Sequence, residues 1–152
     1  MSEFNIDKLV YDKLDALRSR IAANIKTSNQ YASGSMSQSL TIESKPNQWS
    51  LLAAKFFAVL QTGRKPGKMP PISNILNWIK SRSIQLEGKS NLSMAWGIAK
   101  WIAKHGTRLF QSGGRKDIYT NEIKTFKKNL FSDIRIKLSV YIKQTIQDAN
   151  SK

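Results

Sequence analysis

Apolar residues recur at three- and four-residue spacing over residues 5–27 and again over residues 120–149, which is the pattern of one helical face. The sequence therefore predicts a long helix near each end of the chain. Asn5 is a suitable N-cap for the first helix, and Asp7 lies in its first turn, where the helix dipole favours an anion. The apolar positions are Ile6, Leu9, Val10, Leu14, Leu17, Ile21 and Ile25 in the first helix, and Ile123, Phe126, Leu130, Ile134, Leu138, Tyr141, Ile142 and Ile146 in the second.

The second of these helices is long for a chain of 152 residues. At about 1.5 Å per residue it spans roughly 45 Å, more than the core of one small domain requires. We therefore expect part of its apolar stripe to pack outside its own core.

Apolar and polar residues alternate from Met36 to Glu43, which is the period of a half-buried strand. A turn at residues 45–48 and a second apolar run from Trp49 follow, so the sequence predicts an antiparallel hairpin over about residues 35–54. A lone hairpin is only marginally stable in water. We expect helices of the same chain, or strands of a neighbouring subunit, to pack against it.

Two shorter helices are predicted at about residues 72–83 and 91–105. Ser90 or Asn91 can cap the second helix, and Gly106 ends it. Their predicted core residues are Ile72, Leu76, Trp78 and Ile79 in the first helix, and Leu92, Ala95, Trp96, Ala99 and Ile102 in the second.

The elements together predict an α+β fold in which long N- and C-terminal helices flank a small antiparallel β-sheet with additional short helices. A length of 152 residues and an apolar fraction of 40% suit a single domain, residues 1–152, with a real core. The chain has no cysteine, which excludes disulfides and thiolate metal sites and agrees with a reducing environment.

Residues 63–71 form a basic loop between the central segments, with Arg64, Lys65 and Lys68 among three prolines. Because prolines restrict the backbone, the loop holds its charges at a fixed place, which favours a polyanion or a defined site on a partner. The loop lacks the glycine spacing and the Lys-Ser/Thr ending of a nucleotide-phosphate loop.

The net charge of +15 is concentrated in the middle of the chain. Residues 45–121 contain thirteen basic and two acidic side chains, whereas residues 1–44 contain five of each. Such a field attracts nucleic acid or another anionic surface, and a highly soluble basic surface is the alternative. Further candidates for an interface or a DNA-facing surface are Trp101, Arg108, Arg115 and Lys116.

No constellation of residues indicates chemistry at a catalytic centre. His105 is the single histidine, and it falls in the last turn of a predicted helix, where the dipole alone favours a cation. No Asp/Glu cluster has ligand spacing in the basic middle. We therefore expect no catalytic residue, no cofactor and no metal ion. The apolar run from Leu51 to Leu60 is too short to span a bilayer, so we expect no membrane partner.

Four motifs follow the first long helix in a fixed order. They are Ser33 to Leu40, Phe57 to Arg64, Pro70-Pro71-Ile72 with Trp78-Ile79, and Ala99 to Gly106 leading to Asp117-Ile118-Tyr119. With these motifs the chain resembles the neck and tail-completion proteins of tailed phages, small α+β proteins that join head to tail. Similar proteins commonly have Tyr and Glu where this chain has Phe57 and Gln61.

The resemblance implies a structural virion protein, made in the host cytoplasm and not an enzyme. It would be a head–tail connector or tail-completion subunit in a homo-oligomeric ring, six- or twelvefold, around the DNA conduit. The implied partners are the portal and adjacent neck or tail proteins, with nonspecific contact to phage DNA. The alternative function is a sequence-nonspecific DNA-binding or DNA-packaging accessory protein, for which duplex affinity should fall steeply as salt rises.

Overall fold

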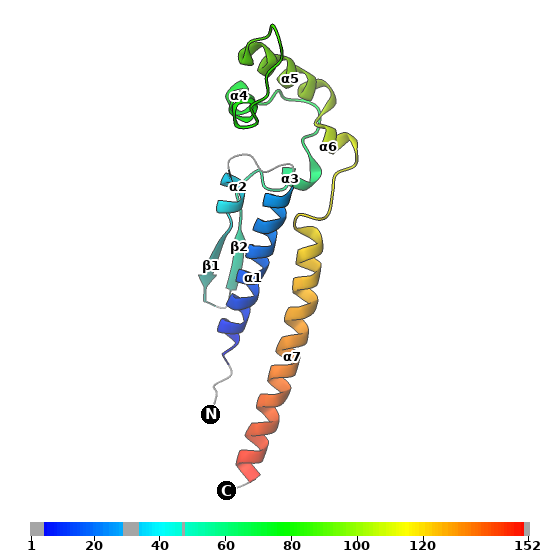
Figure 1. The fold of residues 1–152 in the computed structure, drawn as a ribbon. Helices are drawn as coiled ribbons and strands as arrows, with labels where there is room; N and C mark the ends of the chain where they lie inside the picture. The colour runs from blue at the N-terminus through cyan, green and yellow to red at the C-terminus, as the bar shows by residue number, and fades with distance from the viewer. Residues whose placement is uncertain (1–4, 29–33, 47, 151–152) are drawn as a thin grey trace.

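The computed structural model describes residues 5–28, 34–46 and 48–150. Two long helices, α1 (Ile6–Thr27) and α7 (Thr120–Asn150), run side by side in opposite directions, and a β-hairpin lies along α1 (Figure 1). The α+β architecture predicted from the sequence is thereby confirmed. The remaining elements are α2 (Ser35–Gln38), β1 (Thr41–Lys45), β2 (Gln48–Leu52), α3 (Val59–Thr62), α4 (Ile72–Ser81), α5 (Asn91–His105) and α6 (Arg108–Gln111).

The molecule has three parts, the body, the arm and the neck. The body consists of α1, α2, the hairpin, α3 and α7. The arm consists of α4 and α5, which pack on each other beyond the upper end of the body in Figure 1. The neck, residues 63–71 and 106–117, connects the two parts and includes α6.

The body is built on the apolar stripe that the sequence predicts for α1. Ile21 and Ile25 are almost fully buried, and Ile118 joins them from the segment before α7. The register between the long helices is marked by ion pairs of Arg20 with Glu122 and of Lys13 with Asp133. Since α1 residue numbers fall as α7 residue numbers rise, the two helices are antiparallel.

The hairpin supplies a third layer on α1. Its strands pair antiparallel from Thr41 opposite Leu52 to Lys45 opposite Gln48, and its inner side chains pack against the same core as α1. Trp49 donates a hydrogen bond from Nε1 to Asp7 Oδ1 at 3.1 Å. The expected support of the hairpin by helices is therefore present within one chain.

The arm has its own small core. Ile79 of α4 and Met94 and Ala95 of α5 are buried, and partly buried isoleucines and leucines of the same segment surround them. The Ser90 side chain caps α5 by accepting from Ser93 N at 3.2 Å, and Gly106 ends the helix with φ 77°. The predicted bounds of α5 are thus confirmed.

The predicted start of the hairpin at residue 35 is wrong. Residues Ser35–Gln38 form the helical turn α2, and β1 begins only at Thr41. Two hydroxyls stabilise the turn by donating to backbone carbonyls, Ser37 Oγ to Gly34 O and Ser39 Oγ to Met36 O, each at 2.8 Å. Serine-rich segments offer the backbone this alternative to a strand. The predicted contributions of Ser33 and Asn47 lie outside the described residues.

The tryptophans predicted for the core of the arm are not buried. Trp78 is 41% exposed and Trp96 is 44% exposed, and Leu92 also lies on the surface. Two helices that pack only on each other bury one stripe of each helix, and the buried stripe of α5 runs through Met94, Ala95 and Ala99, which leaves Leu92 and Trp96 outside it. The segment from Thr107 to Asp117 includes the short helix α6, which the sequence pattern does not predict.

Candidate functional site

The basic loop of the neck is fastened to the end of α5. Arg64 N donates to Thr107 Oγ1 at 2.9 Å, and Thr107 N donates back to Arg64 O at 2.8 Å. Gly67 N donates to Ala103 O at 2.8 Å. These hydrogen bonds join segments about forty residues apart, so the loop has a fixed position on the C-terminal turn of α5.

Two glycines allow the neck segments to cross this closely. A Cβ atom on Gly63 would lie 2.4 Å from Phe110 N, and one on Gly106 would lie 2.8 Å from Arg64 O. Both glycines have positive φ, 68° and 77°, a region that residues with a side chain rarely adopt. The crossing therefore requires glycine at both positions.

The three cations of the basic loop have different roles. Arg64 is partly buried, and its guanidinium donates to Lys68 O at 2.8 Å, so this side chain closes the loop on itself. Lys65 and Lys68 extend into solvent. Of the three residues predicted for this loop, the two lysines are the ones available to a partner.

The cations predicted after α5 also divide into two groups. Arg108 and Lys116 are exposed. Arg115 donates from Nε to Asp117 Oδ1 at 2.6 Å and forms a second contact with Asp117 Oδ2. This side-chain hydrogen bond lowers the pKa of the Asp117 carboxyl and raises the pKa of Arg115. Arg115 is therefore committed to an internal pair.

Trp101 is 42% exposed, as expected for a residue outside the inner stripe of α5. Its ring lies against His105 one turn later, with centroids 5.2 Å apart and planes at 40°. His105 Nδ1 also lies 3.2 Å from Trp101 O. Both rings are thus engaged with each other on the surface of α5.

Gln61 joins the neck to the body, a role that the sequence pattern did not indicate. Its side chain is buried; Oε1 accepts from Tyr119 N at 2.7 Å and from Thr120 N at 3.1 Å, while Nε2 donates to Thr120 Oγ1 at 2.7 Å. The Gln61 carbonyl accepts from Arg115 N at 2.9 Å. One residue thereby satisfies backbone donors at the start of α7. The signal for it in the sequence is a polar amide that directly follows the apolar run from Phe56 to Leu60.

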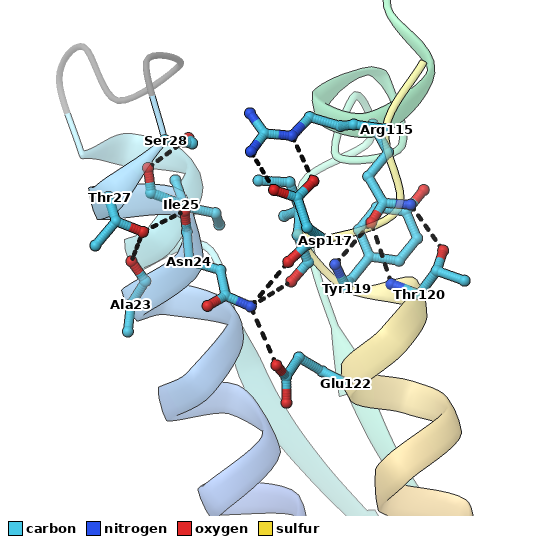
Figure 2. A network of polar contacts seen from close by, with 12 residues as sticks. Ala23, Asn24, Ile25, Thr27, Ser28, Arg115, Asp117, Tyr119, Thr120 and Glu122 are labelled. Atoms are coloured by element: carbon cyan, nitrogen blue, oxygen red, sulfur yellow. Dashed lines mark hydrogen bonds and ion pairs between the residues drawn. The ribbon is translucent and has the colours of Figure 1, made fainter. Parts of the chain in front are cut away.

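Asn24 makes the corresponding connection from α1. Figure 2 shows its amide directed at the segment before α7, where Nδ2 donates to Asp117 O at 3.0 Å and Ile118 O at 3.1 Å. The same nitrogen lies 3.4 Å from Glu122 Oε1. Gln61 and Asn24 together fix the point at which the chain leaves the neck and enters α7.

The second half of α7 exposes an apolar stripe, the distal stripe, which consists of Phe131, Leu138, Tyr141, Ile142 and Ile146. Their exposed fractions range from 43% at Leu138 to 71% at Phe131. Lys13 pairs with Asp133, so the first residue of α1 lies opposite about residue 140 of α7. The last turns of α7 accordingly extend past α1 (Figure 1).

An apolar hollow of about 320 Å³ separates the arm from the body. It opens between α3, α4 and α6, and Trp78 of the arm forms one wall. The lining residues are Met36, Phe56, Val59, Leu60, Gly63, Trp78, Thr107 and Leu109. Among the described residues, no three His, Asp or Glu side chains gather as metal ligands would.

Comparison with protein-family models, with curated proteins and with solved structures found no match to this chain. Within residues 5–28, 34–46 and 48–150, no helix is both long and apolar enough to cross a membrane.

Proposed function

We propose that this chain is a structural virion protein of a tailed phage, a neck, head–tail connector or tail-completion subunit that assembles into a ring around the DNA conduit. The proposal is supported by the motif order between residues 33 and 119 and, above all, by the distal stripe of α7. The ring, of six or twelve copies, would contact the portal and adjacent neck or tail proteins.

The distal stripe carries the proposal because its side chains are 43–71% exposed in the part of the chain that the structure describes. Leu138, Tyr141, Ile142 and Ile146 recur at three- and four-residue spacing and Phe131 lies two turns before Leu138, so the five side chains lie along one side of α7. Together they expose on the order of 600 Å², close to the ~800 Å² that each partner contributes to a stable interface. An area of this size is at the upper end of the apolar patches that monomers expose, and such patches are often functional.

A second copy of the chain is the partner that the charges favour at this patch. Residues 131–150 contain three basic and two acidic side chains, a surplus of one, whereas residues 45–121 have a surplus of eleven. Copies of a chain with a net charge of +15 repel each other least where the local charge is nearly balanced. Neighbouring copies can therefore meet at the distal half of α7 with a much smaller electrostatic cost than at residues 45–121.

The hairpin offers a further surface for assembly. The described sheet contains only β1 and β2, so each strand has one unpaired edge. Open edges pair with strands of other chains, and copies related by rotation can close such contacts into a ring. The hairpin thus provides a lateral contact that complements the one on α7.

Assembly is tested with a double charge substitution on the stripe, Leu138→Glu with Ile142→Glu. Burying these carboxylates in an interface should cost about 2 kcal/mol or more, which is about a 30-fold weaker association. The control is Ile136→Glu with Val140→Glu, which adds the same charge at two exposed apolar positions on the opposite side of α7. Native mass spectrometry and light scattering should show rings for the wild type and the control, and monomers for the stripe variant. Monomers of the wild type, or its absence from purified particles, would contradict the proposal.

The charge surplus of residues 45–121 supports a second candidate, a sequence-nonspecific DNA-binding or DNA-packaging accessory protein. Such a protein acts without a stoichiometric ring. It should bind duplex DNA as a free chain with an affinity that falls steeply with salt. Electron cryomicroscopy of particles separates the candidates, because only the connector occupies a fixed ring position.

A further inference from the structure

We propose that the neck bears a seat for the sugar-phosphate backbone of duplex DNA, formed by Lys65, Lys68, Lys104 and Arg108. The inference rests on the proposed function in one respect, since a subunit around the DNA conduit meets duplex DNA. The four residues are defined as the phosphate seat. Lys104 was not among the predicted candidates, and Arg64 and Arg115, which were, are not part of the seat.

The fold brings the four cations together from three segments. Lys65 and Lys68 lie on the basic loop, Lys104 in the last turn of α5 and Arg108 at the first position of α6. The residue directly before each cation takes part in a hydrogen bond between these segments. Gly67 N donates to Ala103 O and Thr107 N donates to Arg64 O, both at 2.8 Å. The backbones that carry these four charges are therefore locked to one another at one end of the arm.

All four side chains are exposed, and within the described residues none has an ion-pair partner. The nearby arginines differ, because Arg64 donates to Lys68 O and Arg115 pairs with Asp117. Residues 45–121 contain only two acidic side chains, Glu87 and Asp117. The seat is consequently a set of cations without an internal counter-charge.

The seat is held in place before any partner arrives. Gly63 and Gly106 cross against backbone atoms with no room for a side chain, and a Cβ on Gly106 would also lie 3.1 Å from Pro66 Cδ. Ordering a flexible loop on binding costs free energy. A preformed loop avoids much of that cost, so its charges bind a polyanion more tightly than the same charges on a disordered tail.

The surroundings favour the backbone of a duplex over bases or an acidic protein. Trp101, three residues before Lys104, is packed on His105, and this contact reduces the part of its ring that can stack on an unpaired base. The cationic surplus extends over residues 45–121 as a whole and matches a continuous line of phosphates. Contacts of lysine and arginine with phosphates hold a duplex without reading its sequence.

The test compares two variants of equal net charge. In the seat variant Lys65, Lys68, Lys104 and Arg108 become Gln. In the control variant four exposed lysines of the body become Gln. Binding of a labelled duplex of about 30 base pairs is measured by fluorescence anisotropy between about 50 and 200 mM salt. The control positions are Lys8, Lys26, Lys124 and Lys128.

The seat variant should lose about three to four units of the slope of log K against log salt, because each phosphate contact contributes about 0.9. The control should lose less than about one unit. A third variant, with arginine at the three lysine positions and Arg108→Lys, should keep the wild-type slope. Equal losses in the seat and control variants would overturn the proposal, since the charge would then act diffusely.

Two further measurements separate this inference from its competitors. Poly-L-glutamate serves as an acidic polypeptide probe; a seat variant that loses affinity for it while keeping its affinity for DNA would overturn the proposal in favour of a protein partner. The DNA titration is repeated with the seat substitutions on the Leu138→Glu/Ile142→Glu background, so that DNA binding is measured without ring assembly. If the wild type does not assemble, but the seat variant loses more salt slope than the control, the ring is contradicted and the phosphate seat is not. If rings form, but the seat and control variants lose equal slope, the phosphate seat is contradicted and the ring is not.

Discussion

The body and the arm are both largely helical, yet different kinds of contact stabilise them. In the body, Ile21 and Ile118 meet across almost a hundred residues of chain. In the arm, Ile79 packs against Met94 and Ala95, its near neighbours in sequence. Long-range packing makes the body depend on the whole chain, whereas the arm is a local helical pair that leaves three tryptophans partly exposed. The difference indicates that the arm relies on the neck for its position.

The sharpest way to break this comparison is to open a cavity in each core. Ile21→Ala should lower the free energy of unfolding by about 2–5 kcal/mol, because Ile21 is 2% exposed in the body core. Ile79→Ala should lower the protection of arm amides by a similar amount and leave body amides within about 1 kcal/mol of wild type. Hydrogen exchange resolved by residue measures both effects.

The exposed Ile136, which is outside the distal stripe, provides the control for the cavity variants, since Ile136→Ala opens no cavity. If Ile79→Ala reduced protection in the body as much as in the arm, the two parts would unfold as one unit. The distinction drawn between them would then be wrong.

A methyl group added to the neck tests whether the crossing holds the arm. Gly63→Ala should destabilise the protein by about 2 kcal/mol or more, because it combines positive φ with a contact of 2.4 Å to Phe110 N. Gly97→Ala is the matched change within the arm; Gly97 is helical with nothing within 4 Å of an added Cβ, and alanine there should stabilise by about 0.5–1 kcal/mol. Thermal unfolding measures the sign of the stability change in both variants. A Gly63→Ala variant as stable as the wild type would contradict a tight crossing.

The smallest expected effect concerns the junction of neck and body. Gln61→Leu leaves Tyr119 N and Thr120 N without their acceptor and should cost about 1–2 kcal/mol in urea unfolding. Gln61→Glu keeps an acceptor oxygen at the start of α7, where the helix dipole favours a carboxylate, and should stay within about 1 kcal/mol of wild type at neutral pH. Equal losses for both variants would show that the hydrogen bonds to α7 are not what Gln61 contributes.

Much of the fold could be predicted from the sequence because helices are encoded locally. The spacing of apolar residues and the capping side chains Asn5 and Ser90 placed α1 and α5 within a residue of their observed bounds. The excess length of α7 also followed from its pattern alone. The start of the hairpin failed because serine hydroxyls turned residues 35–38 into a helical turn, an outcome that alternation of polarity does not encode.

The sequence by itself determined the four longer helices α1, α4, α5 and α7, that the middle of the chain is strongly basic, and that α7 is longer than one core can cover. Only the tertiary structure decided which cations are free: Arg64 and Arg115 are committed within the chain, whereas Lys104 and Arg108 are brought beside the basic loop. Periodicity and charge are properties of neighbouring residues. The partner of a side chain depends on which distant segments the fold places against it, and that information is shared across the whole chain.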